Sequence, residues 1–237
     1  AQQYSAVNEV APMVPREFRA AWVACVYNID WPSRKGMGAG AQQAEMKAML
    51  DRMASMKMNA IIFQVRPNAD AVYQSRLEPW SHWISGTQGL SPGYDPLAYC
   101  IQQAHARGIE VHAWFNPFRA LPNSKIPTAR NHVVKTHPSV IRDFKNYKWM
   151  DPSNAFTQQR ALSVILDVVN RYDVDGIHID DYFYPYPDVD SQGRAKTIFP
   201  DGKTPAARRA ASDRFVKAMY SKGKAKKPRV RVGISPF

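Results

Sequence analysis

Short apolar runs of strand length recur along the chain and are separated by segments with helical spacing. The runs span residues 20–27, 60–65, 109–115, 176–180 and 230–235. Between them, apolar residues recur at intervals of three and four, which predicts helices at about 41–57, 95–108, 154–172 and 205–221. Strands that alternate with helices predict a parallel sheet built from βαβ units.

The predicted helices have recognisable ends and apolar stripes. Asp95 is a suitable N-cap for the second helix, Pro96 suits its first turn, and Gly108 suits its end. The first helix carries a stripe of methionine and leucine between Met46 and Met56, which is typical of a core-facing surface rather than of a cofactor site.

The loops at the two ends of the predicted strands differ in length. This difference helps to choose between a closed barrel and an open parallel sheet. Helix-to-strand turns are short, whereas the strand-to-helix segments 28–40, 66–94, 116–153 and 182–204 are long. In parallel α/β folds, ligands bind at the carboxyl ends of strands, on such loops. We therefore expect a (β/α)8 TIM barrel, of which this chain covers about the first five strands. The alternative is an open, doubly wound parallel α/β sheet.

Two further observations complete the predicted organisation. Neither GxGxxG after the first strand nor GxxxxGK[ST] anywhere occurs, so the main signatures of nucleotide-binding folds are missing. We expect residues 1–15 to be an N-terminal extension and residues 16–237 to be the N-terminal portion of the (β/α)8 barrel.

Composition and charge limit the range of possible binding partners. The 237 residues carry a formal net charge of +12, and much of the excess lies in residues 205–229. A basic excess favours acidic partners such as nucleic acid, anionic lipid or an anionic polymer. A solvated helix face followed by a Lys-rich turn explains the same pattern more simply. Stacking aromatic residues are not interleaved with the basic run, so we expect no nucleic-acid partner.

Membrane and metal signals are weak. No apolar run reaches the roughly 18 to 20 residues that span a bilayer, so we expect no transmembrane segment. The start AQQYSAVNEV lacks the features of a signal peptide, as a mature exported chain would. Cys25 and Cys100 lie in apolar segments outside any CxxC or Cys/His cluster, which favours buried thiols over a structural zinc site.

The stretch GIHIDDYFYPYP at 176–187 ends an apolar strand in two acids. Side chains alternate along a strand, so His178 and Asp180 point into the barrel if Ile177 and Ile179 face the helices. Asp181 begins the loop. Two neighbouring carboxylates resist ionising together, which favours one of them as an acid. The structural alternative is that one of them caps a turn or pairs with a nearby arginine.

Polar and aromatic residues also stand at the other strand ends: Tyr27, Asn28, Gln64, Arg66, His112, Trp114 and Asn116. The long loops add further rings. Sugars suit such a surface, because their hydroxyls need hydrogen bonds and their CH faces pack on rings. His112 taken alone is more typical of a core histidine, and neither it nor His178 has an evident third metal ligand. We therefore predict no metal site and no cofactor.

The chain resembles the glycosyl-hydrolase-like 10 family. The resemblance rests on REFRAAWVACVYNIDWPS (16–33), on the block IIFQVRPNADAVYQSRLEPWSHWISGTQGLSPGYDPLAY (61–99), on AHARGIEVHAWFNPFR (104–119), on DGIHIDDYFYPYP (175–187) and on RVGISPF at the end. It implies a (β/α)8 barrel, export to the bacterial envelope or surface (often as a lipoprotein), and hydrolysis of a glycan, with peptidoglycan strands as a leading candidate. It also implies that family members extend past residue 237.

These inferences define a site hypothesis. Glycoside hydrolysis normally needs two carboxyl groups, about 5 Å apart for retention or roughly 6.5 to 9.5 Å apart for inversion. We predict Asp180 as nucleophile or base and Asp181 as its nearest proton partner, with Asp70 or a residue beyond this chain as the alternative partner. The predicted substrate-binding residues are Tyr27, Asn28, Arg66, Asp70, Trp80, His112, Trp114, Asn116, His178 and Tyr184.

Two other functions fit the same residues. The first is a carbohydrate-binding barrel protein without catalysis. The second is a metal-dependent deacetylase that uses the two acids and the histidines. Under the glycosidase prediction, the partner is a polysaccharide or a peptidoglycan glycan strand, and the protein is exported to the periplasm or cell surface. The sequence makes no prediction of oligomeric state.

Overall fold

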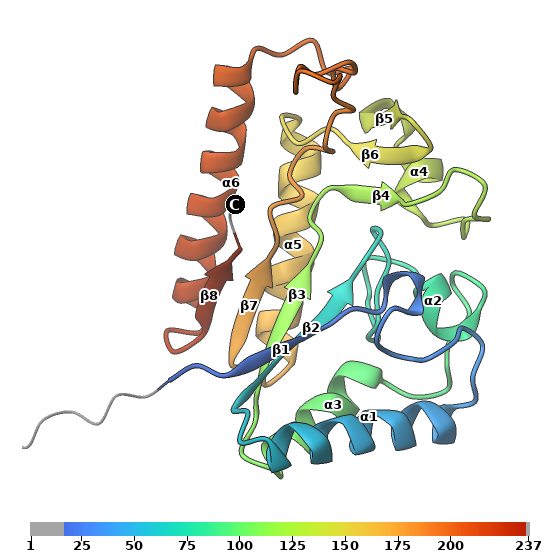
Figure 1. The fold of residues 1–237 in the computed structure, drawn as a ribbon, viewed down its shortest axis with the longest axis vertical. Helices are drawn as coiled ribbons and strands as arrows, with labels where there is room; N and C mark the ends of the chain where they lie inside the picture. The colour runs from blue at the N-terminus through green and yellow to red at the C-terminus, as the bar shows by residue number, and fades with distance from the viewer. Residues whose placement is uncertain (1–16, 236–237) are drawn as a thin grey trace, which may run out of the picture.

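The computed structural model describes residues 17–235 of the chain, and the predicted extension at 1–15 lies outside the described residues. Helices pack against one face of a central parallel sheet, and a small antiparallel sheet stands beside it (Figure 1). The central sheet contains β1 (Ala20–Val23), β2 (Ala60–Arg66), β3 (Glu110–Phe115), β7 (Gly176–Ile179) and β8 (Arg231–Ile234). Its spatial order is β1-β2-β3-β7-β8, and every neighbouring pair is parallel.

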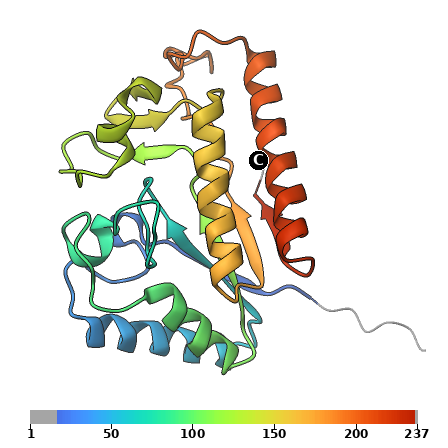
Figure 2. The same cartoon turned by 180° about the vertical axis from the view of Figure 1, so that it is seen from behind.

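The longer helices connect successive strands of this sheet. They are α1 (Ala39–Ser55), α3 (Pro96–His105), α5 (Ala155–Arg171) and α6 (Pro205–Lys226). Their apolar side chains share one continuous core with one face of the sheet. Figure 2 shows α5 and α6 in front of the strands when the molecule is seen from behind. A doubly wound sheet would carry helices on both faces, so helices on one face favour the barrel prediction.

Local signals explain the helix ends. Asp95 accepts a hydrogen bond from the backbone N–H of Ala98 at 3.0 Å, as a good N-cap does. Asn154 and Thr204 cap α5 and α6 in the same way. α6 is longer than predicted, because the Lys-rich segment continues the helix instead of forming a turn. Its Gly223 allows close approach to the sheet, since a Cβ there would lie 3.3 Å from Ile177.

The first strand is shorter than predicted. It ends at Val23, and a 3-10 turn, η1 (Val26–Asn28), follows. The reason is that the backbone N–H groups of Cys25 and Val26 donate to the side-chain oxygen of Gln64, at 2.9 and 3.0 Å. The chain therefore leaves the sheet early and turns across its carboxyl end.

The segment 116–153 was expected to be a long loop, and this expectation is wrong. It forms a three-stranded antiparallel sheet of order β4-β6-β5. The strands are β4 (Arg119–Leu121), β5 (Ile141–Phe144) and β6 (Tyr147–Met150), and two short turns of helix, α4 (Val133–Thr136) and η2 (Pro138–Val140), lie between them. The remaining short helix, α2 (His82–Ser85), lies between β2 and α3.

The inner face of the central sheet, away from the helices, is layered. One layer carries His112 on β3 beside Gly176 on β7, and the next carries Trp114 beside His178. A Cβ at Gly176 would lie 2.2 Å from the His112 ring, and one at Gly233 would lie 2.6 Å from the His178 ring. Each imidazole therefore occupies the space that a glycine leaves on the next strand.

Both cysteines are buried free thiols, as predicted. Burial raises the pKa of the Cys100 thiol to about 12, so it stays protonated. None of the helices in residues 17–235 is both long and apolar enough to cross a bilayer.

Candidate active site

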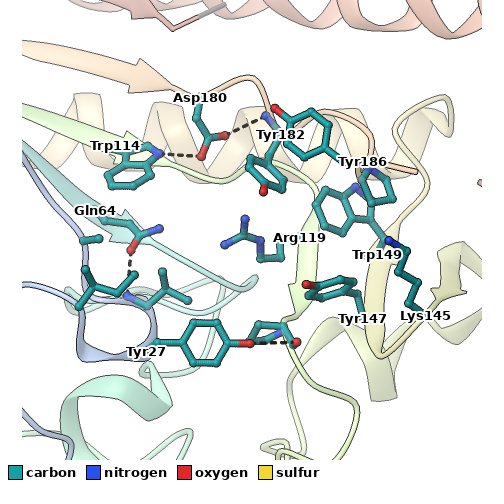
Figure 3. Close-up of a pocket in the computed structure, with 15 residues that line it drawn as sticks. Tyr27, Gln64, Trp114, Arg119, Lys145, Tyr147, Trp149, Asp180, Tyr182 and Tyr186 are labelled. Atoms are coloured by element: carbon teal, nitrogen blue, oxygen red, sulfur yellow. Dashed lines mark hydrogen bonds between the residues drawn. The ribbon is translucent and has the colours of Figure 1, made fainter. Parts of the chain in front are cut away.

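A cleft of about 390 Å³ opens at the carboxyl end of the parallel strands, between the sheet edge and the small antiparallel sheet (Figure 3). Its wall is largely aromatic, made by Tyr27, Trp114, Tyr147, Trp149, Tyr182 and Tyr186. The polar groups are few: the carboxylate of Asp180, the amide of Gln64, and the cations of Arg119 and Lys145. A largely apolar concavity with a small number of placed polar groups is the usual form of a ligand site.

Asp180 follows directly after β7, and its carboxylate is held by three donors. The indole N–H of Trp114 donates to Oδ2 at 3.2 Å, and the side-chain amide of Asn116 donates to the same oxygen. The backbone N–H of Tyr182 donates to Oδ1 at 3.2 Å. These contacts fix the orientation of the carboxylate, and the whole Asp180 residue is only 6% exposed. Asp180 is thus placed at the mouth of the sheet, at the position that strand alternation predicted.

The electrostatic setting of Asp180 combines opposing effects. Burial raises its pKa, while the charge of Arg119 and the three hydrogen bonds lower it, and the net direction is upward. Burial disfavours the ionised form, whereas donors that point at a carboxylate favour it. A carboxyl group in this setting holds its proton to a higher pH than an exposed aspartate does, as catalytic carboxyl groups often do.

A chain of amides connects Asp180 to the first two strands. Gln64 donates from Nε2 to the Asn116 side-chain oxygen at 2.6 Å, so the Asn116 amide nitrogen is left to donate to Asp180. The Gln64 oxygen in turn accepts the turn N–H groups of Cys25 and Val26. The network therefore fixes the direction of each amide and ties the carboxylate to β2 and to the segments that directly follow β1 and β3.

Arg66 was predicted to bind substrate, and the structure places it behind the cleft. Its guanidinium is fully buried and forms a two-point ion pair with Glu78, at 2.6 and 2.7 Å. It also donates to the backbone carbonyl oxygens of Asn116 and Pro117, at 2.6 and 2.9 Å. Arg66 therefore anchors the backbone that carries Asn116 and does not line the cleft.

The residues of the first turn have separate roles. Tyr27 has a positive φ of 56°, its ring lines the cleft, and its hydroxyl donates to the Pro122 carbonyl at 3.1 Å. Asn28 does not line the cleft: its amide donates to the carbonyl oxygens of Pro32 and Trp83, both at 2.9 Å. The hydrogen bonds of Asn28 hold the turn that presents Tyr27.

Asp70 is a buried acid outside the cleft. It accepts hydrogen bonds from Gln88 at 2.9 Å and from the backbone N–H of Asn68 at 3.2 Å. Burial, reinforced by the nearby charge of Glu78, raises its pKa to about 6 despite these bonds. Trp80 also lies away from the cleft lining, in a bridge of its backbone to Ala71.

His112 and His178 lie in the layers of the inner face and do not line this cleft. His112 contacts Glu110 at 3.1 Å, and His178 contacts the hydroxyl of Ser235 at 3.1 Å. Burial, together with the nearby His112, lowers the pKa of His178 to about 4, so its ring is neutral at pH 7. Trp22 packs edge-on against both His178 and Trp114, which supports the cleft floor.

Asp181 and Tyr184 differ from Asp180 in their surroundings. Neither lines the cleft. One oxygen of Asp181 and the hydroxyl of Tyr184 are buried without a hydrogen-bond partner in the described residues. The Tyr184 ring packs against Phe199, with ring centroids 5.5 Å apart, and Arg208 lies 5.4 Å above it. The structure thus brings Asp180, Tyr27 and Trp114 together at the cleft, with Asn116 directly behind Asp180.

The prediction omitted the half of the cleft that comes from the antiparallel sheet. Arg119, Tyr147 and Trp149 lie on β4 and β6, and Lys145 lies in the turn between β5 and β6. The sequence IRDFKNYKWM at 141–150 contains a signal for this hairpin, since its rings and apolar side chains recur on either side of a short polar turn. Within residues 17–235, no group of three or more His, Cys, Asp or Glu side chains is arranged to hold a metal ion.

A parallel sheet with helices on one face, and a polar and aromatic cleft at the carboxyl ends of its strands, defines a protein of the (β/α)-barrel class. The chain belongs to the Glycosyl hydrolase-like 10 family, whose model matches residues 17–237. The resemblance seen in the sequence is therefore confirmed.

Individual proteins agree with this assignment. Glycosyl hydrolase YngK of Bacillus subtilis is 40% identical over 94% of this chain and 45% of its own length. Glycosyl hydrolase DigH of Escherichia coli K12 is 34% identical over 92% of this chain and 54% of its own length. The chain thus spans about half the length of these relatives.

Solved structures support the fold. Alpha-L-fucosidase isoenzyme 2 from Paenibacillus thiaminolyticus superposes with a TM-score of 0.58, at 14% identity, over 93% of this chain and 32% of that chain. The structural neighbours are TIM-barrel glycosidases. At this identity the likeness shows the fold alone, and it confirms the predicted fold class.

Proposed function

We propose that this chain forms part of the catalytic barrel of a glycoside hydrolase, with Asp180 as nucleophile or base. One observation carries the proposal. A buried, rigidly oriented carboxylate faces an aromatic cleft at the carboxyl end of a parallel strand. That is where enzymes of this barrel type place their reacting groups. The family assignment supports a glycosidase-like role.

The cleft can supply two parts of the reaction. Its rings offer flat apolar surfaces for the CH faces of sugar units, and the Tyr27 ring in the cleft wall packs in a tilted geometry against Trp83 behind it. Asp180 can attack an anomeric carbon, or it can take a proton from an attacking water molecule. Either role needs the ionised carboxylate, which the donors Trp114 and Asn116 stabilise.

A second carboxyl group is needed to protonate the leaving oxygen. Among the described residues, the cleft lining contains one carboxylate, that of Asp180. We keep Asp181 as the proposed proton partner in this chain, because it is adjacent in sequence and partly exposed; since it does not line the cleft, this role requires its side chain to turn toward the cleft. The alternative is a residue outside the described range. Asp70 is buried beside Gln88 and fits a structural role better.

We further propose a peptidoglycan glycan strand as the substrate and an exported location for the protein. What supports both is the family resemblance, together with the aromatic and cationic cleft. Neither relative's name specifies a substrate.

The test is the release of reducing ends from peptidoglycan strands freed of their peptides. Wild-type protein and an Asp180→Asn variant are compared, with Asp143→Asn as the matched control, because Asp143 is an exposed acid outside the cleft. We expect Asp180→Asn to reduce the rate at least about a hundredfold and Asp143→Asn to leave it unchanged. Equal rates for wild type and Asp180→Asn would contradict the proposed role.

A second function is favoured by the single carboxylate in the described cleft: binding of a glycan without catalysis. Under this alternative, the strands bind to the wild-type protein but no reducing ends appear. Binding is followed by the fluorescence of the cleft residues Trp114 and Trp149.

A further inference from the structure

Arg119 differs from the other cation of the cleft. Lys145 is paired with Asp188 at 2.5 Å. The guanidinium of Arg119, by contrast, forms no hydrogen bond and no ion pair with any residue that the structure describes; its contacts are with rings. A positive charge that lines a cleft and lacks a partner is available to a ligand.

The two aromatic contacts leave the polar edge of the guanidinium open. Its central carbon lies 4.7 Å from the centre of the Tyr182 ring and 5.9 Å from that of Trp149. Stacking on a ring occupies the flat face of an arginine, while its N–H groups project from the edge. The backbone pairing of Arg119 with Trp149 holds the side chain at this place in the sheet. Figure 3 shows Arg119 reaching into the middle of the cleft.

Arg119 is not placed in the cleft in order to neutralise Asp180. The Asp180 carboxylate is satisfied by neutral donors from Trp114, Asn116 and the backbone of Tyr182, and Arg119 acts on it only at a distance. The guanidinium therefore keeps its full capacity for a two-point contact with another anion.

We propose that Arg119 binds a carboxylate of the substrate, so that the cleft selects a glycan whose sugars carry free carboxylates. The proposal rests on the proposed function, because it assumes that the cleft holds a glycan. Arginine and carboxylate match each other in a bidentate geometry, which gives direction as well as charge. Two chemical sources supply such a group: the ring carboxylate of a uronic acid, and the lactyl ether of a peptidoglycan strand that carries no peptide.

The test compares acidic and neutralised forms of one polymer. Peptide-free strands are used either intact or after their carboxylates have been converted to neutral methylamides. An oligouronate represents the other source of carboxylates, the uronic acid. The proteins are wild type, Arg119→Gln, Arg119→Lys, and Lys148→Gln as the control. Lys148 lies on the same antiparallel sheet but pairs with Asp143 at 2.6 Å, outside the cleft lining. Thermal unfolding of each variant establishes that it folds.

We expect neutralisation of the strands to raise KM for wild type at least about tenfold. Arg119→Gln should raise KM to a similar extent on intact strands and should make no further difference on neutralised ones. Arg119→Lys should recover part of the loss, and Lys148→Gln should resemble wild type. An oligouronate that binds with the same dependence on Arg119 would support the proposal and assign the carboxylate to a ring.

Two outcomes would overturn the inference. In the first, Arg119→Gln weakens activity equally on acidic and neutral strands, and the loss is in kcat. Arg119 would then act through Asp180 rather than on the substrate. In the second, wild type binds acidic and neutral oligosaccharides equally. That comparison uses tryptophan fluorescence, so it decides the inference even if no strand is cleaved and the proposed hydrolase activity fails.

Discussion

Replacement of Arg66 by methionine tests whether this arginine supports the fold from behind the cleft or binds substrate within it. Both members of the Arg66–Glu78 pair have fully buried side chains, and their closest N–O distance is 2.6 Å. Methionine keeps much of the apolar volume but removes the charge. The substitution therefore leaves Glu78 with a buried charge and with one weaker partner, Arg160, at 3.4 Å.

The expected magnitude follows from these distances. At 2.6 Å and an effective dielectric constant of about 20, the attraction between the two charges is roughly 6 kcal/mol, and desolvation of both groups offsets part of it. Removing one member of a buried pair costs about 3–5 kcal/mol, and Arg160 favours the lower end of that range. For a domain of this size, about 3 kcal/mol lowers Tm by about 6–12 °C.

Thermal unfolding followed by circular dichroism measures this effect. The control is Arg107→Met, whose partner Asp51 is 57% exposed and whose loss should cost less than about 1 kcal/mol. In the double variant Arg66→Met with Glu78→Gln, the unpaired charge is gone, so at least half of the lost stability should return. Equal Tm shifts for Arg66→Met and Arg107→Met, or no recovery in the double variant, would refute the reasoning.

The pH dependence supplies a second check. Burial alone would raise the pKa of Glu78, but the charge and hydrogen bonds of Arg66 bring it below its usual value. A depressed carboxyl pKa contributes stability above the unfolded pKa of about 4.3, and this stability is lost as the pH falls through the folded pKa. The difference between wild type and Arg66→Met should thus be full at pH 7 and should narrow as the solution is acidified.

Two other substitutions test the structure. Asp70 has a raised folded pKa of about 6 against about 3.9 unfolded, so its ionisation destabilises the fold by about 2–3 kcal/mol above pH 6. We expect the difference in Tm between Asp70→Asn and wild type to rise from pH 4 to pH 7. The amide also loses part of the contact with Gln88, but that loss does not depend on pH. A Tm difference that stays constant with pH would show that burial does not raise the pKa of Asp70. Gly176→Ala should lower the free energy of unfolding, measured in urea, by about 1–3 kcal/mol, because the added Cβ would overlap the His112 ring. A second substitution, His112→Ala, should restore much of this loss. Gly40→Ala, with open space around its Cβ, is the control, and an equal loss there would remove the steric explanation.

The sequence predicted those parts of the molecule whose signals are local. Asp95 and Pro96 define the start of α3 because an N-cap and a fixed φ act within one turn. Strand alternation placed Asp180 correctly at the carboxyl end, because the period of two holds wherever one face of a strand is buried.

What the sequence did not show depends on contacts between distant segments. The turn of the β5–β6 hairpin places Lys145 at a φ of 55°, where glycine or asparagine is the usual signal. Arg66 is the last residue of β2 and Asp180 directly follows β7, yet the loop after β2 brings Glu78 back to Arg66 and closes it off from the cleft. Arg119 and Asp180 are 61 positions apart in the sequence, and they face the same cleft because β3, which leads into β4, pairs with β7.

The pairing of imidazoles with glycines on the inner face has a consequence for how this family can change over generations. Gly176 leaves room for the ring of His112, and Gly233 leaves room for that of His178. A larger residue at either glycine is harmful while the ring is present and becomes acceptable only after the histidine has been replaced by something smaller. Substitutions at these pairs therefore have a required order, with the histidine changing first, so the route between two related sequences is constrained even where both end points are stable.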